Sequence, residues 1–446
     1  MKKTLFATLV VLLAAVMAVT FVACGKETVN PNDPKSDVSI YKSSGDQPEL
    51  PDMVNWEDIN AFQSTDEIAK LYETDKAAAI AQARQVAVDF FRYCKTAQWI
   101  PADSWDFTHH DNGDGPDTLD AGMPYGGLPY VGLASSGIYR LLDFMDPETG
   151  VVNIYAAGGK NAELQKFFGN QCANGAYQGW SRVINSSKYS GTPNMTEANG
   201  FYRLGDYVYR DSYLTGWSDG YGTDECKNEK ENGEKVMWAA YAKLDVGDGI
   251  VNYTTAGHVV MIATKAVVVY KDEAKTIIDP DKSFVTVIDQ TPQWASMEDS
   301  EGNNYEYQAN VDAKWSFTKL YSGNYLPFTY AEWLGNDPIE ATEVKYTHAG
   351  ETISLEQLFK SKVECNYHIY DIYASIYNAD GVEVAKVATH SNGASEYKIQ
   401  FQKNGILSVI WGDLESLAPT EYEYTVKVYA QLGTGERPTL WEGKLA

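Results

Sequence analysis

Apolar residues recur at three- and four-residue spacing between Thr65 and Phe91, which predicts helical structure in this segment. Asp75 is a suitable N-cap, because its carboxylate can accept hydrogen bonds from the first amides of a helix. The apolar face would carry Ile80, Ala83, Ala87, Phe91 and Cys94. Cys94 is therefore expected to be a buried core thiol.

A second helical pattern begins at Cys172. The apolar positions that follow at helical spacing are Ala173, Ala176, Tyr177, Trp180, Val183 and Ile184. Asn170 is a plausible N-cap just before them. The pattern places Cys172 in the first turn of an amphipathic helix.

Continuous apolar runs further along the chain predict buried strands. The run from Gly257 to Ala263 reads as a central strand with His258 at its start. A strand over 267–270 and a strand over 284–290 are expected next, and the latter ends in Asp289 and Gln290. Neighbouring strands of one sheet could bring one of these two side chains beside His258.

From Thr342 onward the pattern changes to short alternating segments separated by turns such as Asn378–Gly381. The predicted strands cover 367–377, 382–387, 397–401, 407–410 and 422–430. This pattern is typical of a small antiparallel β-sandwich. With the boundary near Pro338, the sequence predicts an α+β domain over 51–338, with a helical lead-in, and a β-sandwich accessory domain over 339–446.

The N-terminus has the layout of a secretory signal peptide over 1–23, in which Lys2 and Lys3 precede an apolar run from Leu5 to Val22. The run ends in Phe21–Cys24, which resembles a bacterial lipobox with Cys24 as the lipidated residue. The alternative is a transmembrane anchor, although about 18 apolar residues are marginal for spanning a bilayer. Residues 24–50 are polar and are expected to form a flexible tether. We expect a lipid-anchored protein of the cell envelope, on the periplasmic or surface face of the outer membrane, that meets the membrane only through its lipid.

Composition narrows the classes of partner. The chain of 446 residues has 61 acidic and 36 basic residues and a formal net charge of −25. Such a charge makes nucleic acid or an anionic bilayer an unfavourable partner, because both are bound through basic patches. The hydrophobic fraction of 44% is sufficient for packed cores and excludes global disorder. We expect a monomer that binds no nucleic acid.

Cys172 is the candidate nucleophile. The amides and dipole at the start of a helix favour a thiolate and can help to hold an oxyanion. His258 is the only histidine between Cys172 and the predicted domain boundary, which makes it the candidate base. A third residue should orient the imidazole, and Asp289 is preferred with Gln290 close behind. In an oxidising envelope, Cys172 could instead pair with Cys226, which would block this chemistry.

Two other motifs are weaker. The loop at 109–115 has glycines where a calcium loop needs ligands, so we expect a solvated loop and no metal site. Residues 216–220 fit a serine-hydrolase elbow but are followed by a charged segment where an apolar helix is required. No cofactor is expected.

Four segments in this order resemble the NlpC-type and CHAP cell-wall hydrolases of the papain-like cysteine peptidase superfamily. They are Gly122–Gly127, Cys172 at a helix start, Leu244–Ile250 and Gly257–Val259. The resemblance covers roughly 122–330 and implies a papain-like fold, with Tyr125 lining the cleft near the oxyanion. This chain departs from the family where Gln171 and Ala173 flank the cysteine and where Val246 replaces a turn proline.

The resemblance implies hydrolysis of an amide bond, with peptidoglycan stem peptides or another peptide as the substrate. The alternative from a different functional class is a non-catalytic surface lipoprotein that binds peptide or glycan on a degenerate hydrolase fold.

Overall fold

The computed structural model describes residues 53–106, 118–131, 136–146, 148–153, 168–185, 201–207, 232–252, 257–298, 302, 304–391, 397–404, 408–419 and 422–446. Over these ranges the fold is mixed α+β, with more strand than helix, which confirms the predicted class at that level. Every helix within them is too short or too polar to cross a bilayer. The predicted signal peptide, Cys24 and the tether lie outside the described residues.

The helical lead-in comprises α2 (Trp56–Ala61), α3 (Thr65–Thr74) and α4 (Lys76–Thr96). Asp75 caps α4 as predicted, because its side chain accepts a hydrogen bond from the amide three residues further on. Cys94 is fully buried, which confirms the predicted core thiol, and burial raises the pKa of this thiol to about 12.

A mixed sheet of nine strands forms the larger part of the molecule, in the order β5-β1-β4-β10-β9-β8-β7-β11-β6. Its strands are β1 (Gln98–Pro101), β4 (Tyr125–Gly126), β5 (Val151–Val152), β6 (Phe201–Arg203), β7 (Gly249–Asn252), β8 (His258–Ile262), β9 (Phe284–Glu298), β10 (Asn304–Ser316) and β11 (Tyr325–Tyr330). Strand β8 lies inside this sheet and is buried after its first residue, as predicted. Two short strands, β2 (Trp105–Asp106) and β3 (Thr118–Leu119), pair separately.

The strand expected over 267–270 does not form. This segment makes only isolated bridges, Val267 with Phe284 and Tyr270 with Ile278. The hydroxyl of Ser283 accepts from the amide of Val269 and donates to its carbonyl, so a side chain replaces the ladder bonds there. The predicted strand ending at residue 290 instead continues to residue 298, where it turns into β10.

Helix α7 (Cys172–Trp180) packs against α4 and across β8 and β9. Two of its glycines permit this approach. A Cβ at Gly179 would lie 2.4 Å from the carbonyl oxygen of Ala87, and one at Gly175 would lie 2.7 Å from Cβ of Gln290. The helix begins at Cys172 as predicted.

The cap of α7 is a correction to the prediction. Gln171 is the N-cap, and its side chain accepts from the amide of Ala173. Asn170 instead donates its side-chain amide to the carbonyl of Ser136 at 2.8 Å, within the core. The described helix ends at Trp180, before the predicted positions 183 and 184.

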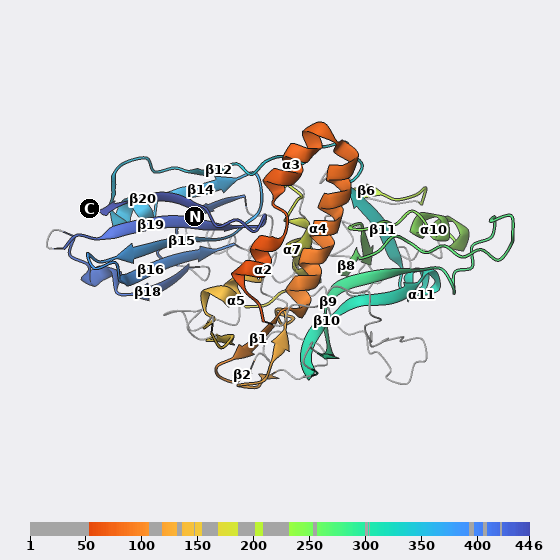
Figure 1. Ribbon diagram of the computed structural model, residues 1–446, viewed down its shortest axis with the longest axis horizontal. Helices are drawn as coiled ribbons and strands as arrows, with labels where there is room; N and C mark the ends of the chain where they lie inside the picture. The colour runs from red at the N-terminus through yellow and green to blue at the C-terminus, as the bar shows by residue number, and fades with distance from the viewer. Residues whose placement is uncertain are drawn as a thin grey trace, which may run out of the picture.

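The remaining helices of this part are α5 (Tyr139–Asp143), α10 (Glu234–Tyr241) and α11 (Phe317–Ser322). Helices α10 and α11 contact each other, and both lie at the end of the molecule beyond β8 and β9 (Figure 1).

The C-terminal part contains two sheets. The six-stranded sheet has the order β13-β20-β19-β15-β16-β18, and the three-stranded sheet has the order β12-β14-β17. Its elements are β12 (Val344–Tyr346), β13 (Thr352–Ile353), α12 (Leu355–Leu358), β14 (Lys362–Cys365), β15 (Ile369–Tyr377), β16 (Glu383–His390), β17 (Lys398–Gln400), β18 (Ser408–Gly412), η7 (Leu414–Ser416), β19 (Thr425–Leu432) and β20 (Thr439–Leu445). Both sheets contribute to one apolar cluster, which joins Val363 and Ile399 to Ile372 and Val428.

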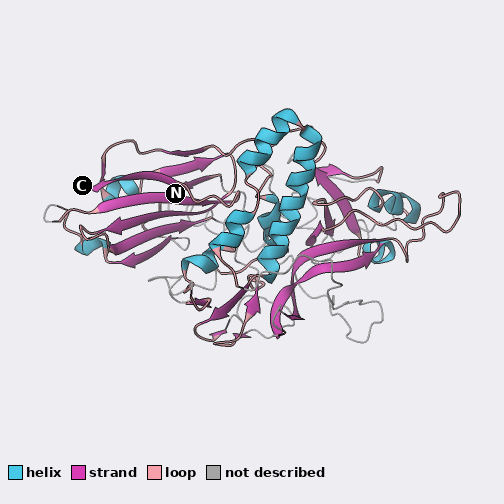
Figure 2. Ribbon diagram, viewed as in Figure 1, coloured by secondary structure: helices cyan, strands magenta, loops and turns pink. Residues whose placement is uncertain are grey.

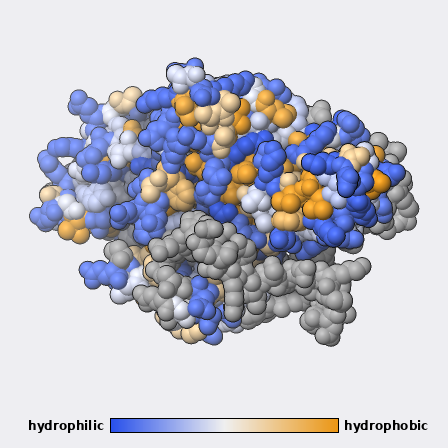
Figure 3. Space-filling model, turned by 45° about the vertical axis from the view of Figure 1, so that its right-hand side comes forward, coloured by the Kyte–Doolittle hydropathy of each residue, from blue (hydrophilic) through white to orange (hydrophobic). Residues whose placement is uncertain are grey.

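The helices α3, α4 and α7 lie between this C-terminal part and strands β8 to β11 (Figures 1 and 2). A space-filling view of one face shows mainly hydrophilic side chains, with apolar ones in small separate patches (Figure 3).

Candidate active site

Cys172 is the first residue of α7, and its side chain lies at the N-terminal end of the helix. The sulfur lies 3.4 Å from Oε1 of Gln171 and 3.9 Å from the carbonyl oxygen of Gly257, the residue directly before β8. The helix start and the start of β8 therefore meet at this thiol. Cys172 has no exposed surface in this structure.

His258 opens β8, and its Nε2 lies 2.8 Å from Oδ2 of Asp289 on β9. The two strands are antiparallel, with Met261 opposite Ile288. In this register His258 and Asp289 are diagonal neighbours on one face of the sheet. The His258 side chain is 21% exposed and that of Asp289 is 1% exposed, so the pair runs from the surface into the protein.

Asp289 is held from its other side by Asn310, its register partner on β10. The backbone amide and the side-chain amide of Asn310 both donate to Oδ1 of Asp289, each at 2.9 Å. Asn310 thereby fixes the position of the carboxylate that contacts His258. Sequence reasoning missed Asn310, because it did not predict the hairpin that places β10 beside β9.

Gln290 points to the opposite face of β9, as the next residue of a strand must. Its Nε2 donates to the carbonyls of Leu128 at 3.1 Å and Gln308 at 2.8 Å, and its Oε1 accepts from the buried ammonium of Lys95. The structure therefore brings His258 together with Asp289, the preferred of the two candidates, and not with Gln290.

Tyr125 lies on β4 and is nearly buried. Its hydroxyl accepts a hydrogen bond from the amide of Asp120 at 2.9 Å, and its ring packs against Trp99 and Trp294. None of these contacts involves Cys172 or His258, so the role of Tyr125 near an oxyanion stays a prediction.

Tyr325 on β11 forms one wall beside the imidazole. Its ring meets that of His258 edge to face, with 6.4 Å between centroids, and Trp315 packs behind it at 5.4 Å. The candidate base therefore has an aromatic neighbour on one side and a carboxylate on another.

The segment Leu244–Ile250 contacts helices α4 and α7 and holds them in place. Asp248 is buried, and it accepts hydrogen bonds from Arg84 at 2.9 Å and from Thr329 at 2.6 Å. Burial raises the pKa of Asp248 to about 6, against the opposing effect of Arg84. The carbonyl of Gly247 accepts from the indole of Trp180 at 2.8 Å, which anchors the end of α7.

Several sequence candidates lie outside the described residues: Cys24, Cys226, the loop at 109–115 and the motif at 216–220. The possible pairing of Cys172 with Cys226 thus stays a prediction. Across the described ranges, His, Cys, Asp and Glu side chains form no group of three or more that could hold a metal ion.

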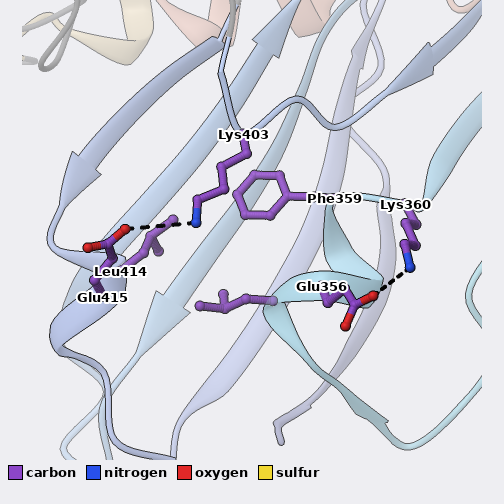
Figure 4. A pocket seen from close by; sticks show the side chains of 7 residues that line it. Glu356, Phe359, Lys360, Lys403, Leu414 and Glu415 are labelled. Atoms are coloured by element: carbon purple, nitrogen blue, oxygen red, sulfur yellow. Dashed lines mark hydrogen bonds and ion pairs between the residues drawn. The ribbon is translucent and has the colours of Figure 1, made fainter.

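A pocket of about 320 Å³ lies elsewhere, on the C-terminal part between α12 and η7 (Figure 4). Leu355, Phe359 and Leu414 supply its apolar surface. Its charged residues pair with one another, Lys360 with Glu356 at 2.6 Å and Lys403 with Glu415 at 3.8 Å. Because these charges already compensate each other, the pocket offers less reactive chemistry than the Cys172 region.

Comparison with protein-family models, curated proteins and solved structures found no match to this chain.

Proposed function

We propose that this chain is a cysteine hydrolase that cleaves an amide bond through an acyl-enzyme. Two observations carry the proposal. Asn310, Asp289 and His258 form a connected series of hydrogen bonds, and the helix-start thiol of Cys172 lies 3.9 Å from the carbonyl oxygen of Gly257, the residue directly before His258. A nucleophile, a base and a fixed carboxylate are the three parts that such chemistry requires.

In the proposed reaction, the Cys172 thiolate attacks the carbonyl carbon and forms a C–S bond, while His258 carries the thiol proton. The amide of Cys172 at the helix start stabilises the tetrahedral oxyanion, and Tyr125 is proposed to line the cleft beside it. Collapse breaks the C–N bond, and His258 passes its proton to the leaving amine. Water, deprotonated by His258, then hydrolyses the thioester and releases the acid. Because Nε2 faces Asp289, Nδ1 is the nitrogen that exchanges protons in this scheme.

The packing of α7 across β8 and β9 supports a papain-like arrangement, in which the nucleophile helix lies against the strands that carry the base and the orienting acid. The two C-terminal sheets with one shared apolar cluster support a β-sandwich accessory domain. With the predicted signal and lipobox, we propose action in the cell envelope on peptidoglycan stem peptides.

One observation favours a second function, a non-catalytic protein that binds peptide or glycan. Cys172 has no exposed surface, although a nucleophile must reach its substrate. On this alternative, the cysteine and histidine would be remnants of an ancestral hydrolase.

Release of free amines from purified cell-wall peptides separates the two functions. The hydrolase proposal predicts that the wild type releases amines and that Cys172→Ala does not. The Tm of Cys172→Ala should equal that of the wild type. A matched control is Cys94→Ala, which removes a buried thiol of α4 that takes no part in the proposed reaction and should retain activity per folded molecule. Equal background release by the wild type and Cys172→Ala would favour the binding function.

A further inference from the structure

Lys95, in the last turn of α4, is a buried cation that the proposed mechanism does not use. It is 1% exposed, its ammonium donates to Oε1 of Gln290, and it lies 5.1 Å from the centroid of the Phe91 ring. A neutral amide oxygen is weak compensation for a buried charge. A buried charge with weak compensation lowers the stability of the fold. Such groups are often found at functional sites, so it matters which other charged groups lie near Lys95.

The position of Lys95 is fixed by Gln290. The amide nitrogen of Gln290 donates to two backbone carbonyls, which leaves the amide oxygen facing Lys95. The same side chain packs against Gly175, where a Cβ atom would lie 3.5 Å from the Gln290 oxygen. Gly175 is in the first turn of α7, so the ammonium lies beneath the turn that begins with Cys172.

We propose that Lys95 is a positioning residue whose buried positive charge favours the ionised form of the Cys172 sulfur from the face of the sheet opposite His258. This inference rests on the proposed function, because it concerns the reactivity of the same thiol. The chain would thus place two cationic influences on the thiol, the helix N-terminus and Lys95.

The expected size of the effect follows from the separation. One helical turn and one side chain separate the ammonium from the sulfur, a distance that we estimate as roughly 10 Å. At an effective dielectric constant of about 20, a charge at that distance lowers a thiol pKa by about one unit. Burial lowers the pKa of Lys95 itself to about 8, while Cys94 and Asp289 oppose this shift. Lys95 is therefore cationic at neutral pH. The other charged groups near it are Arg182, which acts on the neighbouring Cys94, and Asp289 and His258, which lie on the opposite face of the sheet.

The test compares Lys95→Met with the wild type in the full chain. The measurement is the pH dependence of the rate at which iodoacetamide alkylates Cys172, followed by peptide mass spectrometry, together with Tm. We expect the midpoint of the alkylation profile to rise by about one pH unit and the rate at pH 7 to fall about tenfold. Tm should be unchanged or higher, because an uncompensated buried charge is replaced by an apolar side chain of similar length. Lys70→Met, which removes an exposed lysine on α3, is the matched control and should alter neither quantity.

A folded Lys95→Met protein with the wild-type midpoint would overturn the inference and leave the proposed function intact. Failure of Lys95→Met to fold would also overturn it, because Lys95 would then be a structural residue. A wild-type protein whose Cys172 does not react at any pH at which the protein is folded would contradict the proposed function and, with it, this inference.

Discussion

In the ranges that the structure describes, two pairs of histidine and aspartate lie in very different surroundings. His258 meets Asp289 at 2.8 Å, and the imidazole is 21% exposed. His390 meets Asp371 at 2.5 Å, and both side chains are almost completely buried. The imidazole of the first pair follows Gly257, whose carbonyl oxygen lies 3.9 Å from the Cys172 sulfur, whereas the second pair contacts Arg140.

The second pair joins the two parts of the chain. Arg140 on α5 donates to Asp371 on β15 at 2.6 Å, and Tyr373 donates to the other oxygen of Asp371 at 3.1 Å. Burial opposes ionisation of Asp371, but Arg140 and His390 hold the pKa of its carboxyl well below the usual range. The same two residue types therefore stabilise an interface when an arginine compensates the carboxylate, and we propose that they drive proton transfer when a thiol lies next to the imidazole.

The largest expected contrast is between His258→Ala and His390→Ala. Loss of a general base lowers the rate of amide hydrolysis by about 10²–10⁴-fold, so His258→Ala should be nearly inactive with a Tm close to that of the wild type. His390→Ala should lower Tm and retain activity per folded molecule. It opens the buried cluster of Arg140, Asp371 and His390 and leaves the candidate active site in place. Activity per folded molecule and Tm for both variants check this contrast, which fails if the two variants lose activity equally.

Removal of one partner from the buried cluster should rank next. Asp371→Asn leaves Arg140 buried without its anionic partner, and we expect a loss of about 3–5 kcal/mol in the free energy of unfolding. Asp289→Asn should cost less, because its imidazole partner can remain neutral. Urea unfolding of both variants measures the difference, and an equal loss would show that the two pairs are equivalent in stability.

Stability should fall in acid through the buried histidines of the second region. Burial lowers the pKa of His390 and lowers that of His368 to about 3. Below pH 6.5 these histidines are protonated in the unfolded chain but remain neutral in the folded chain. Each histidine therefore lowers the free energy of unfolding by about 1.4 kcal/mol per pH unit until its folded-state pKa is reached. His368→Phe keeps an aromatic ring against Tyr370 and should flatten this slope between pH 6 and pH 4. A wild-type slope in that variant would contradict the assignment.

The smallest effect is expected at Asn310, which holds Asp289 but touches neither the imidazole nor the thiol in the contacts described. Asn310→Ala should reduce hydrolysis about tenfold, the loss of roughly one charge-assisted hydrogen bond. Asn310→Asp would place a second carboxylate against Asp289 and should be more harmful. Steady-state rates at several pH values test this order, and the reverse order would show that Asn310 does not act through Asp289.

Local periodicity predicted the parts of this fold that depend on one segment. The Asp75 cap, the buried Cys94, the start of α7 at Cys172 and the strand after His258 follow from residues close in sequence. What the sequence could not supply were pairings between distant segments. Asn310 reaches Asp289 through a hairpin, and Lys95 reaches Gln290 across 195 positions. The sequence also did not indicate that Gln171, and not Asn170, caps α7. The side chain of Asn170 instead donates a hydrogen bond to the carbonyl of Ser136.

The most direct test of the central claim compares three thiols in one folded protein. Cys94, Cys172 and Cys365 are all buried, and burial raises the pKa of the Cys94 thiol to about 12 and that of Cys365 to about 11. If burial alone set the reactivity, the three thiols would be alkylated equally slowly. If His258 activates Cys172, this thiol should react much faster than the other two. Peptide mapping after a timed pulse of iodoacetamide at pH 7, without reductant, should show Cys172 labelled at least about 100-fold faster than the other two. Labelling of all three at one slow rate would contradict the assignment of Cys172 as the nucleophile.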